Sequence, residues 1–384
     1  MPRLLVVTSS YPVEDNPASG IFVQKILQHL PPTWQITVLT PATAQDHRVR
    51  REGRILVHPV VYAPRRWMRL AHAPGGIMPQ LQRQPALLLL VPLLLLSLAW
   101  RTLRLARHHD LIYANWAING AFAGLVGQLL HRPVVLALRG SDVHGVAERR
   151  LKRWVLRQAA GRARCITAVS EDFAQAARPW LAAQAPLSVL PNGVDEALLH
   201  LPLPQLGQHI EIMALGSLIP VKDHRTLILA LQALRDHAWH LRIFGEGPER
   251  ERLQGLIEHL QLQDRISLPG AIPPQQVPAA LAAHAVFIHP SLAEGRSNAV
   301  LEAMAAGRII IASDIASQRE LLAPDAGLLF APGQVNALRA ALTRLWQEPA
   351  VDWGRHARQH LCERGLTWPS AGERLHRILA SCLH

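Results

Sequence analysis

The sequence predicts an α/β protein with two consecutive, doubly wound domains built on parallel sheets. Short apolar runs alternate with longer helical patterns along nearly the whole chain. These runs lack the polar alternation of a sheet with one solvated face, so we expect helices on both faces of each sheet. The chain, at 384 residues, is long for a single core, and its second half repeats the rhythm of the first.

The predicted elements follow in chain order. In the first half we expect strands at residues 4–8, 36–39, 55–59, 111–114, 134–138 and 165–169, with helices at 22–30 and 120–130. In the second half we expect strands at 211–215, 240–244, 266–268, 286–289, 309–312 and 327–330, with helices at 225–237, 249–260, 277–284, 299–306 and 335–346. Prolines and a glycine in residues 201–207 indicate a linker between a first domain, 1–200, and a second, 208–366. Ligands favour the carboxyl ends of such strands and the cleft between two such domains.

The composition indicates which kinds of binding partner and which cellular compartment to expect. There are 40 lysines and arginines against 28 acidic residues, and the net charge of +12 favours nucleic acid, a phospholipid surface or phosphorylated small molecules. Three scattered cysteines without a C-x-x-C spacing argue against a disulfide framework and a zinc site, and they fit a reducing, cytoplasmic compartment. None of the twenty histidines lies in a metal-binding spacing, so we expect no metal. The first ten residues are typical of a buried strand, not of a signal peptide.

The segment 290–312, PSLAEGRSNAVLEAMAAGRIIIA, carries the strongest local signal. A strand ends at Pro290, a polar loop follows, and a helix begins at a good N-cap and stops at Gly307. The free N–H groups at the start of the helix suit a hydroxyl-rich or anionic group. The alternative is a loop acid followed by a solvated helix acid. The residues that we expect to bind the ligand are Glu294, Gly295, Arg296, Ser297, Asn298 and Glu302.

Two further loops of the second half follow strands directly. In LGSLIPVK, residues 215–222, Gly216 and Ser217 precede Lys222, whose mobile charge suits a phosphate. In FGEGPER, residues 244–250, Gly245 allows a tight turn and a close approach of the backbone to a flat ligand. Each pattern alone is also compatible with an ordinary βα loop.

Two loops of the first half carry weaker signals. Gly20 stands at the start of a predicted helix, where phosphate or sugar can approach the backbone. The segment LRGSDVH, residues 138–144, groups Arg139, Ser141, Asp142 and His144 after a strand. Ser141 does not lie in a nucleophile elbow, so no catalytic triad follows from this group.

In their order along the chain, these segments resemble the retaining glycosyltransferases of family 4, also called glycosyl transferases group 1, which have the GT-B fold. The resemblance includes the Gly20 loop, the GSD segment 140–142, residues 169–170, PNGVD at 191–195, the G-S-L…K segment, GEGPER and the E-x7-E segment 294–302. The closing TWPSAGERLHRIL, residues 367–379, is similar to the family's last helix. That similarity implies a third region, 367–384, that packs back on the first domain.

The resemblance implies a donor site in the second domain and an acceptor site in the first. A nucleotide-diphosphate sugar would be held with Glu302 at the ribose, Glu294 and the following amides at the sugar, and Lys222 at the diphosphate. Gly20 would let its loop close over the phosphates. The leaving phosphate would help to deprotonate the acceptor, so neither a metal, a cofactor nor a protein nucleophile is implied.

The sequence departs from the family pattern at two positions. Ser217 stands where the family usually has Arg, so we expect Lys222, or another base such as Arg296, to carry more of the charge. Arg139 stands where the family usually has His. Because Arg does not deprotonate, we expect it to contact sugar or phosphate rather than to act as a base. The expected catalytic residues are Glu294, Lys222 and Arg139; Asp142, Gly216, Ser217 and Gly245 join the expected donor site.

An apolar run at residues 86–100 lies between two arginine-rich stretches. It is either a buried helix of the first domain or an interfacial element that contacts an anionic membrane, and it is short for a span. We therefore expect a lipid-linked or polysaccharide acceptor and a place at the inner face of the cytoplasmic membrane. Two alternatives are a GT-B epimerase or hydrolase of sugar nucleotides and a non-catalytic anion-binding or membrane-binding scaffold. Nucleic acid is disfavoured because only 5% of residues are aromatic.

Overall fold

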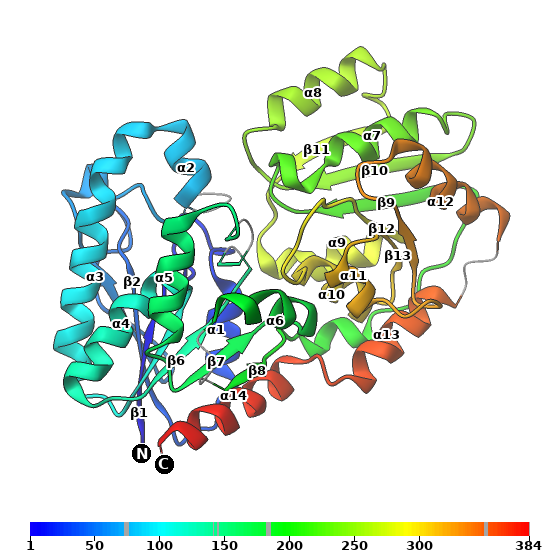
Figure 1. The fold of residues 1–384 in the computed structure, drawn as a ribbon. Helices are drawn as coiled ribbons and strands as arrows, with labels where there is room; N and C mark the ends of the chain where they lie inside the picture. The colour runs from blue at the N-terminus through cyan, green and yellow to red at the C-terminus, as the bar shows by residue number, and fades with distance from the viewer. Residues whose placement is uncertain (73–76, 141, 144–145, 182–185, 349–351, 384) are drawn as a thin grey trace. The chain divides into compact units, whose positions relative to one another are not determined.

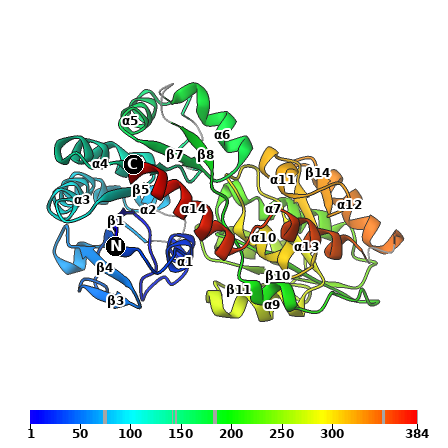
Figure 2. The same cartoon turned by 90° about the horizontal axis from the view of Figure 1, so that it is seen from below.

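The computed structural model describes residues 1–72, 77–140, 142–143, 146–181, 186–348 and 352–383, which form two compact units (Figures 1 and 2). The first unit consists of Met1–Asn192 together with Trp368–His384, and the second of Gly193–Thr367. Residues 193–200, which the sequence analysis assigns to the first domain, therefore lie in the second unit. The reason is local, since Val194 N–H donates to Leu366 O at 3.1 Å and Leu198 is buried in a core of that unit.

The first unit is built on an eight-stranded sheet with the order β3-β4-β2-β1-β5-β6-β7-β8. All neighbouring strands are parallel except β3 and β4, which are antiparallel. The central strand β1 is buried from Leu4 to Val7, as its apolar sequence predicts. The strands are β1 (Arg3–Val7), β2 (Gln35–Pro41), β3 (Arg50–Glu52), β4 (Ile55–Val60), β5 (Leu111–Asn115), β6 (Val134–Ala137), β7 (Cys165–Ala168) and β8 (Leu187–Val189).

Helices cover the sheet of the first unit, and the last helix of the chain is one of them. Helix α14 packs against α1, and Trp34 Nε1 donates to His376 Nδ1 at 3.0 Å. Figure 2 shows α14 beside α1. The helices are α1 (Ile21–Gln28), α2 (Ile77–Arg83), α3 (Leu90–Ala106), α4 (Ala117–Leu130), α5 (Arg150–Ala160), α6 (Glu171–Ala177) and α14 (Trp368–Leu383), with short 3-10 helices η1 (Arg65–Trp67), η2 (Pro85–Leu89) and η3 (Arg178–Trp180).

The second unit has a six-stranded parallel sheet with the order β11-β10-β9-β12-β13-β14. Counted within the unit this is the 3-2-1-4-5-6 order of a doubly wound domain, in which the direction of winding reverses between β9 and β12. Ligands bind outside the carboxyl ends of the strands at such a point. The strands are β9 (Ile210–Leu215), β10 (Trp239–Phe244), β11 (Ile266–Gly270), β12 (Val286–His289), β13 (Ile309–Ser313) and β14 (Leu328–Phe330).

Helices pack on both faces of this sheet and bury two apolar cores. The helices are α7 (His224–Gln232), α8 (Arg250–His259), α9 (Val277–Ala283), α10 (Asn298–Ala305), α11 (Ala316–Leu321), α12 (Val335–Gln347) and α13 (Trp353–Glu363), with 3-10 helices η4 (Glu196–His200), η5 (Pro220–Lys222) and η6 (Pro274–Gln276). The two doubly wound sheets confirm the predicted fold class, and every predicted strand is present within one or two residues of its expected bounds.

The apolar run 86–100 lies in η2 and α3, which continue each other over Pro85–Ala106. This helical stretch has 22 residues and by length and composition is enough to cross a membrane, whereas the apolar run itself covers only residues 86–100. One side of it packs on the sheet, because Leu90, Leu94 and Leu98 belong to a core with Leu5. The opposite side is exposed, and the exposed fraction of Leu89 reaches 80%.

Candidate active site

Two loops of the second unit meet where its winding reverses. One follows β9 and ends at Lys222 in η5; the other follows β12 and contains Glu294. Because β9 and β12 are neighbours in the sheet, their carboxyl ends bring the two side chains together. Lys222 Nζ donates to Glu294 Oε1, and both side chains are largely shielded from solvent. The structure thus joins two predicted residues that are 72 positions apart in the sequence.

Three donors converge on the same oxygen of Glu294. Besides Lys222, His289 Nε2 lies 3.1 Å and Ser291 Oγ 3.0 Å from Oε1. Burial by itself raises the pKa of the carboxyl, but Lys222 and His289 outweigh it, so the pKa of Glu294 lies well below its ordinary value. Glu294 is therefore an ionised acceptor of hydrogen bonds at neutral pH and cannot serve as a general acid.

Two buried histidines next to this pair are neutral. Burial lowers the pKa of His289, although Glu294 opposes the change. Burial, His289 and Lys222 together lower the pKa of His224, the first residue of α7, to about 3. Lys222 therefore lies beside two uncharged imidazoles, one of which holds Glu294 in place. Neither histidine is predicted from the sequence, although His289 ends a buried strand five residues before Glu294.

Helix α10 begins as predicted at the loop that contains Glu294. Ser297 is the N-cap, and its hydroxyl accepts a hydrogen bond from the N–H of Val300 at 3.3 Å. Gly295 precedes the cap and Asn298 opens the helix. Glu302 lies on α10 and is partly exposed between buried neighbours. Gly307 follows the helix with a φ of 66°, which confirms the predicted glycine stop.

The structure assigns Arg296 to a different contact from the one expected. Its side chain is 2% exposed, and its guanidinium pairs with Glu320 of α11, which Arg364, directly after α13, also contacts. A buried guanidinium that already binds a carboxylate is held by the fold. Arg296 thus pairs with Glu320, contrary to the expectation that it helps Lys222 to replace the charge that is lost at Ser217.

The glycines of the loop after β10 are needed for its packing against the loop after β9. Gly245 has a φ of 152°, and a Cβ at this position would lie 1.9 Å from Gly216 O. The loops are also joined by backbone hydrogen bonds, from Gly216 N–H to Phe244 O and from Leu218 N–H to Glu246 O. The close approach predicted for Gly245 is thus made by protein backbone, and it fixes the loop that carries Ser217 and Lys222.

In the first unit, Arg139 lies after β6 and is held by three polar side chains. Its guanidinium donates to Asn115 Oδ1 at 2.9 Å, to Tyr113 OH at 3.0 Å and to Asn192 Oδ1 at 3.4 Å. It also lies over the ring of Phe22, 5.0 Å from the centroid. Arg139 is a partly buried, fixed cation at the carboxyl ends of the central strands, as a contact to sugar or phosphate requires.

Asp142 has a structural role in this loop. Its two carboxylate oxygens accept hydrogen bonds from the N–H of Ala117, at the start of α4, and from the N–H of Arg139. The side chain is buried, and burial raises its pKa against the effect of these bonds. Both oxygens are occupied, so Asp142 positions Arg139, and its expected direct role at the donor is not supported. Ser141 and His144 lie outside the described residues.

Trp116, which the sequence analysis did not single out, has a strained backbone at the end of β5. Its φ of 69° and ψ of 144° fall in a region that is almost restricted to glycine. Its ring lies 6.1 Å from that of Phe22. Trp116, Phe22 and Arg139 therefore form an aromatic and cationic platform where the winding of the first sheet reverses, between β1 and β5. The members of the platform are far apart in the sequence. The sequence pattern therefore predicts only Arg139, which lies in the segment after β6 that also contains Asp142.

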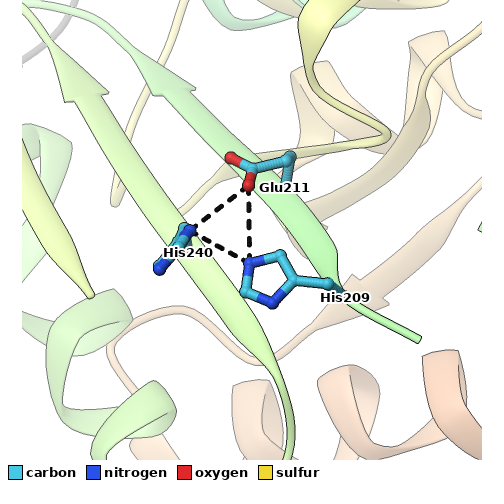
Figure 3. Close-up of side chains that lie close together, drawn as sticks. All are labelled: His209, Glu211 and His240. Atoms are coloured by element: carbon cyan, nitrogen blue, oxygen red, sulfur yellow. Dashed lines mark hydrogen bonds and ion pairs between the residues drawn. The ribbon is translucent and has the colours of Figure 1, made fainter. Parts of the chain in front are cut away.

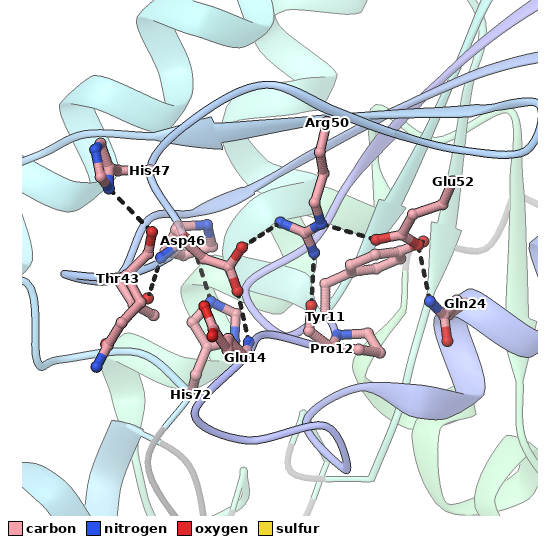
Figure 4. Close-up of polar contacts among 12 residues, drawn as sticks. Tyr11, Pro12, Glu14, Gln24, Thr43, Asp46, His47, Arg50, Glu52 and His72 are labelled. Atoms are coloured by element: carbon pink, nitrogen blue, oxygen red, sulfur yellow. Dashed lines mark hydrogen bonds and ion pairs between the residues drawn. The ribbon is translucent and has the colours of Figure 1, made fainter.

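Gly20 is fixed by the loop that precedes it. It has a φ of 59°, and a Cβ would lie 2.3 Å from Ser10 O, so no other residue fits. The same loop is tied to β3, as Figure 4 shows: Arg50 binds Asp46 and Glu52, and Glu52 also accepts from Tyr11 OH. Burial and Glu52 raise the pKa of Tyr11, so its hydroxyl stays protonated. The loop around Gly20 is thus built into a polar network.

Solved structures share this pair of doubly wound units. Sucrose-phosphate synthase from Thermosynechococcus elongatus is 19% identical, with a TM-score of 0.82 and 99% of each chain covered. HepE from Anabaena, solved in complex with UDP and glucose, is 18% identical, with a TM-score of 0.76 and 99% of this chain and 100% of that chain covered. The fold and the site at the reversal of winding define a protein of the GT-B class.

The family follows from the sequence. The family model described as Glycosyltransferase Family 4 matches residues 20–198, and that of Glycosyl transferases group 1 matches residues 204–360. The chain belongs to this family of group 1 and family 4 glycosyltransferases. A putative teichuronic acid biosynthesis glycosyltransferase, TuaC of Bacillus subtilis (strain 168), is 27% identical over 91% of this chain and 92% of its own length. The 2-deoxystreptamine glucosyltransferase of Streptomyces kanamyceticus is 30% identical over 52% of this chain and 54% of its own.

Proposed function

We propose that the protein is a retaining hexosyltransferase of cell-surface glycan synthesis. It transfers a sugar from a nucleotide-diphosphate sugar to a lipid-linked or polysaccharide acceptor. The relatives support the setting, since they include the putative teichuronic acid enzyme and an O-antigen chain mannosyltransferase of Escherichia coli. The GT-B neighbour HepE, solved with UDP and with UDP-glucose, supports a nucleotide-sugar donor.

The observation that carries the proposal is the contact between Lys222 and the ionised Glu294. When a donor binds, its diphosphate takes the place of the carboxylate as the partner of Lys222. The charge that develops on the leaving phosphate is then stabilised by a lysine that is already in position. Glu294, held by His289 and Ser291, accepts hydrogen bonds from hydroxyl groups of the sugar. Because Ser217 is neutral and Arg296 is engaged with Glu320, Lys222 carries most of this charge.

The chain needs no nucleophile for this reaction. The acceptor hydroxyl attacks on the face from which the diphosphate leaves, and a phosphate oxygen takes its proton. The bond between the sugar carbon and the phosphate oxygen breaks while the new glycosidic bond forms, so the configuration is retained. Lys222 is the electrostatic catalyst, and Glu294 and Glu302 orient sugar and ribose. No metal or cofactor takes part in the proposed step.

The platform of the first unit is the proposed place of the acceptor. Aromatic rings bind the apolar face of a sugar, while a guanidinium binds its hydroxyls or a phosphate. Trp116 and Phe22 supply the rings, and Arg139 supplies the cation. Strain at Trp116 supports a functional role, since such strain persists where the surrounding structure imposes it.

We propose that the exposed face of α3 contacts the anionic inner face of the cytoplasmic membrane. Leu89, Leu93, Leu96 and Trp100 are spaced along one side of the stretch and are between 48% and 80% exposed. Three exposed arginines follow at its C-terminal end, where they meet lipid phosphates: Arg101, Arg104 and Arg107. Apolar side chains with a basic border are typical of peripheral binding.

A transfer assay tests the function. Labelled nucleotide-diphosphate hexoses are incubated with the enzyme and with membranes from a glycan-producing bacterium, and the label is followed into lipid and polysaccharide. We expect incorporation from one donor, its loss in Lys222→Ala and Glu294→Gln, and wild-type incorporation in Lys25→Ala, which removes the same charge at α1. Release of free sugar or an isomerised donor without incorporation would support the hydrolase or epimerase alternative.

Flotation with liposomes tests the membrane contact. We expect the protein to float with anionic vesicles at low salt and to stay at the bottom with neutral ones, because the attraction is electrostatic in part. Replacement of Leu93 and Leu96 by Ser, or of the three arginines by Gln, should release it. Equal flotation of these variants and the wild type contradicts the contact on α3.

A further inference from the structure

Three side chains of the second unit form a cluster at the amino ends of β9 and β10 (Figure 3). His209 immediately precedes β9, Glu211 is its second residue, and His240 is the second residue of β10. The register pairs Glu211 with His240, so both side chains lie on the same face of the sheet. The proposed donor residues follow the carboxyl ends of the strands. Five residues of strand, about 16 Å, separate Glu211 from Gly216, so the cluster is a separate feature.

The three possible ligand atoms form a nearly equilateral triangle. His209 Nε2 lies 3.0 Å from His240 Nδ1 and 3.4 Å from Glu211 Oε1, and His240 Nδ1 lies 3.3 Å from the same oxygen. Zinc binds imidazole nitrogen and carboxylate oxygen at about 2.0–2.2 Å, and tetrahedral angles then separate the ligands by about 3.3–3.5 Å. The observed triangle approximates one face of such a tetrahedron.

Protons do not account for all three contacts as well as a cation does. A neutral imidazole nitrogen is either a donor or an acceptor, and an ionised carboxylate only accepts. If both nitrogens carry a proton, the contact between the histidines joins two donors. If one nitrogen is unprotonated, its lone pair faces the lone pairs of Glu211. A cation at the centre attracts all three atoms at once.

We propose that His209, Glu211 and His240 bind a divalent transition-metal ion of the Zn²⁺ class. Two imidazoles and one carboxylate are ligands that such ions prefer, whereas Mg²⁺ and Ca²⁺ prefer oxygen alone. All three side chains are between 33% and 47% exposed, so the ion enters from solvent and its fourth position is open to water or another ligand. The ion joins the segment that enters β9 to the neighbouring strand β10.

Zinc titration of the full chain, produced without a histidine tag and stripped with chelator, tests the proposal. A chromophoric chelator competes for the metal, and Co²⁺ absorption reports tetrahedral nitrogen and oxygen ligation. We expect one equivalent of Zn²⁺ with a raised Tm, and no such effect of Mg²⁺. In His240→Ala and Glu211→Gln the affinity should fall at least about tenfold. The matched control is His259→Ala, an exposed histidine of α8, which should bind as the wild type does.

Three results would overturn the proposal: no equivalent of Zn²⁺ binds, His240→Ala and Glu211→Gln keep the wild-type affinity, or His259→Ala loses as much affinity as they do. Glu211→Gln keeps the size of the side chain, so its circular dichroism and Tm without metal show whether it folds. A change in donor binding is not required, because the ligand triad lies at the opposite end of β9 from Lys222.

Discussion

At the scale of single residues, the state of Glu294 follows from its neighbours. Burial alone would favour the protonated acid, but one lysine, one histidine and one serine point at the same oxygen. The effect of Lys222 and His289 exceeds the cost of desolvation, so the pKa of Glu294 is lowered. The carboxylate stays ionised throughout the neutral range, as a hydrogen-bond acceptor for sugar hydroxyls requires.

The buried His224 makes stability depend on pH. Its pKa is about 3 in the folded protein and about 6.5 in the unfolded chain. The folded state has its full stability with respect to His224 above pH 6.5. This stability is lost as the pH falls below 6.5, because the unfolded state then binds a proton at His224 that the folded state does not bind. Between pH 7 and pH 5 this residue should lower the free energy of unfolding by about 2 kcal/mol. Urea denaturation at pH 5, 6 and 7 measures the slope.

Two variants isolate this contribution. His224→Gln should have a shallower pH dependence than the wild type, whatever its stability at pH 7. His259→Gln, which replaces an exposed histidine in the same unit, should keep the wild-type slope. If His224→Gln and the wild type have equal slopes, His224 is not the buried neutral group described above.

Strain at Trp116 predicts an inverted order of stability. Ala is usually more stabilising than Gly, but only Gly adopts a φ of 69° with a ψ of 144° at low cost. Trp116→Gly should therefore be about 1 kcal/mol more stable than Trp116→Ala. Both should raise KM for the acceptor without changing KM for the donor. Trp180, half-buried under Arg153 in the same unit, is the control, and there the Ala variant should be the more stable one.

At the scale of elements, the loops after β9 and β10 act as one piece. Gly245→Ala would place a Cβ 1.9 Å from Gly216 O, so we expect a loss of more than about 2 kcal/mol in the free energy of unfolding. Gly255→Ala in α8 has nothing within 4 Å of the new Cβ and should gain about 0.5–1 kcal/mol. Thermal unfolding compares the two, and equal effects of both changes contradict this packing.

The sequence was sufficient for elements with a strong apolar signal. Buried strands such as β1 and β12 contain almost only apolar residues, so their pattern predicts them. Strands β3 (RRE) and β8 (LSV) are three residues long. Because β3 is entirely charged and β8 has one polar residue among three, the apolar pattern does not predict them, and cross-strand pairing defines them. Helices α11 and α13 were also not predicted; their sequences mix polar residues with few apolar ones.

At the scale of the whole molecule, those residues of the site that directly follow a strand in the sequence could be predicted. Lys222 and Glu294 both follow strands, and a parallel sheet brings the ends of neighbouring strands together. The binding partners of a side chain could not be predicted. The pairing of Arg296 with Glu320, the capping by Asp142 and the triad of His209, Glu211 and His240 join residues that no spacing rule connects. They depend on which elements pack together.

The charge of the protein is consistent with the same account. A net charge of +12 attracts several kinds of anion, but the position of individual cations distinguishes their roles. Lys222 lies at the proposed diphosphate site, Arg139 is part of the proposed acceptor platform, and the arginines at the C-terminal end of α3 lie at the proposed lipid surface. Arg296, buried against Glu320, contributes to the fold.

The dissociation constant of nucleoside diphosphates tests the central claim most directly, because it requires neither the sugar nor the acceptor. Calorimetry with UDP, GDP and ADP should show that one of them binds to the wild type and to Lys25→Ala with equal affinity. Lys222→Ala should bind it at least about tenfold more weakly, since a partly buried charge-assisted contact is lost. Equal binding by Lys222→Ala and the wild type, or binding of none of the three by a folded wild type, contradicts a donor site built on Lys222 and Glu294.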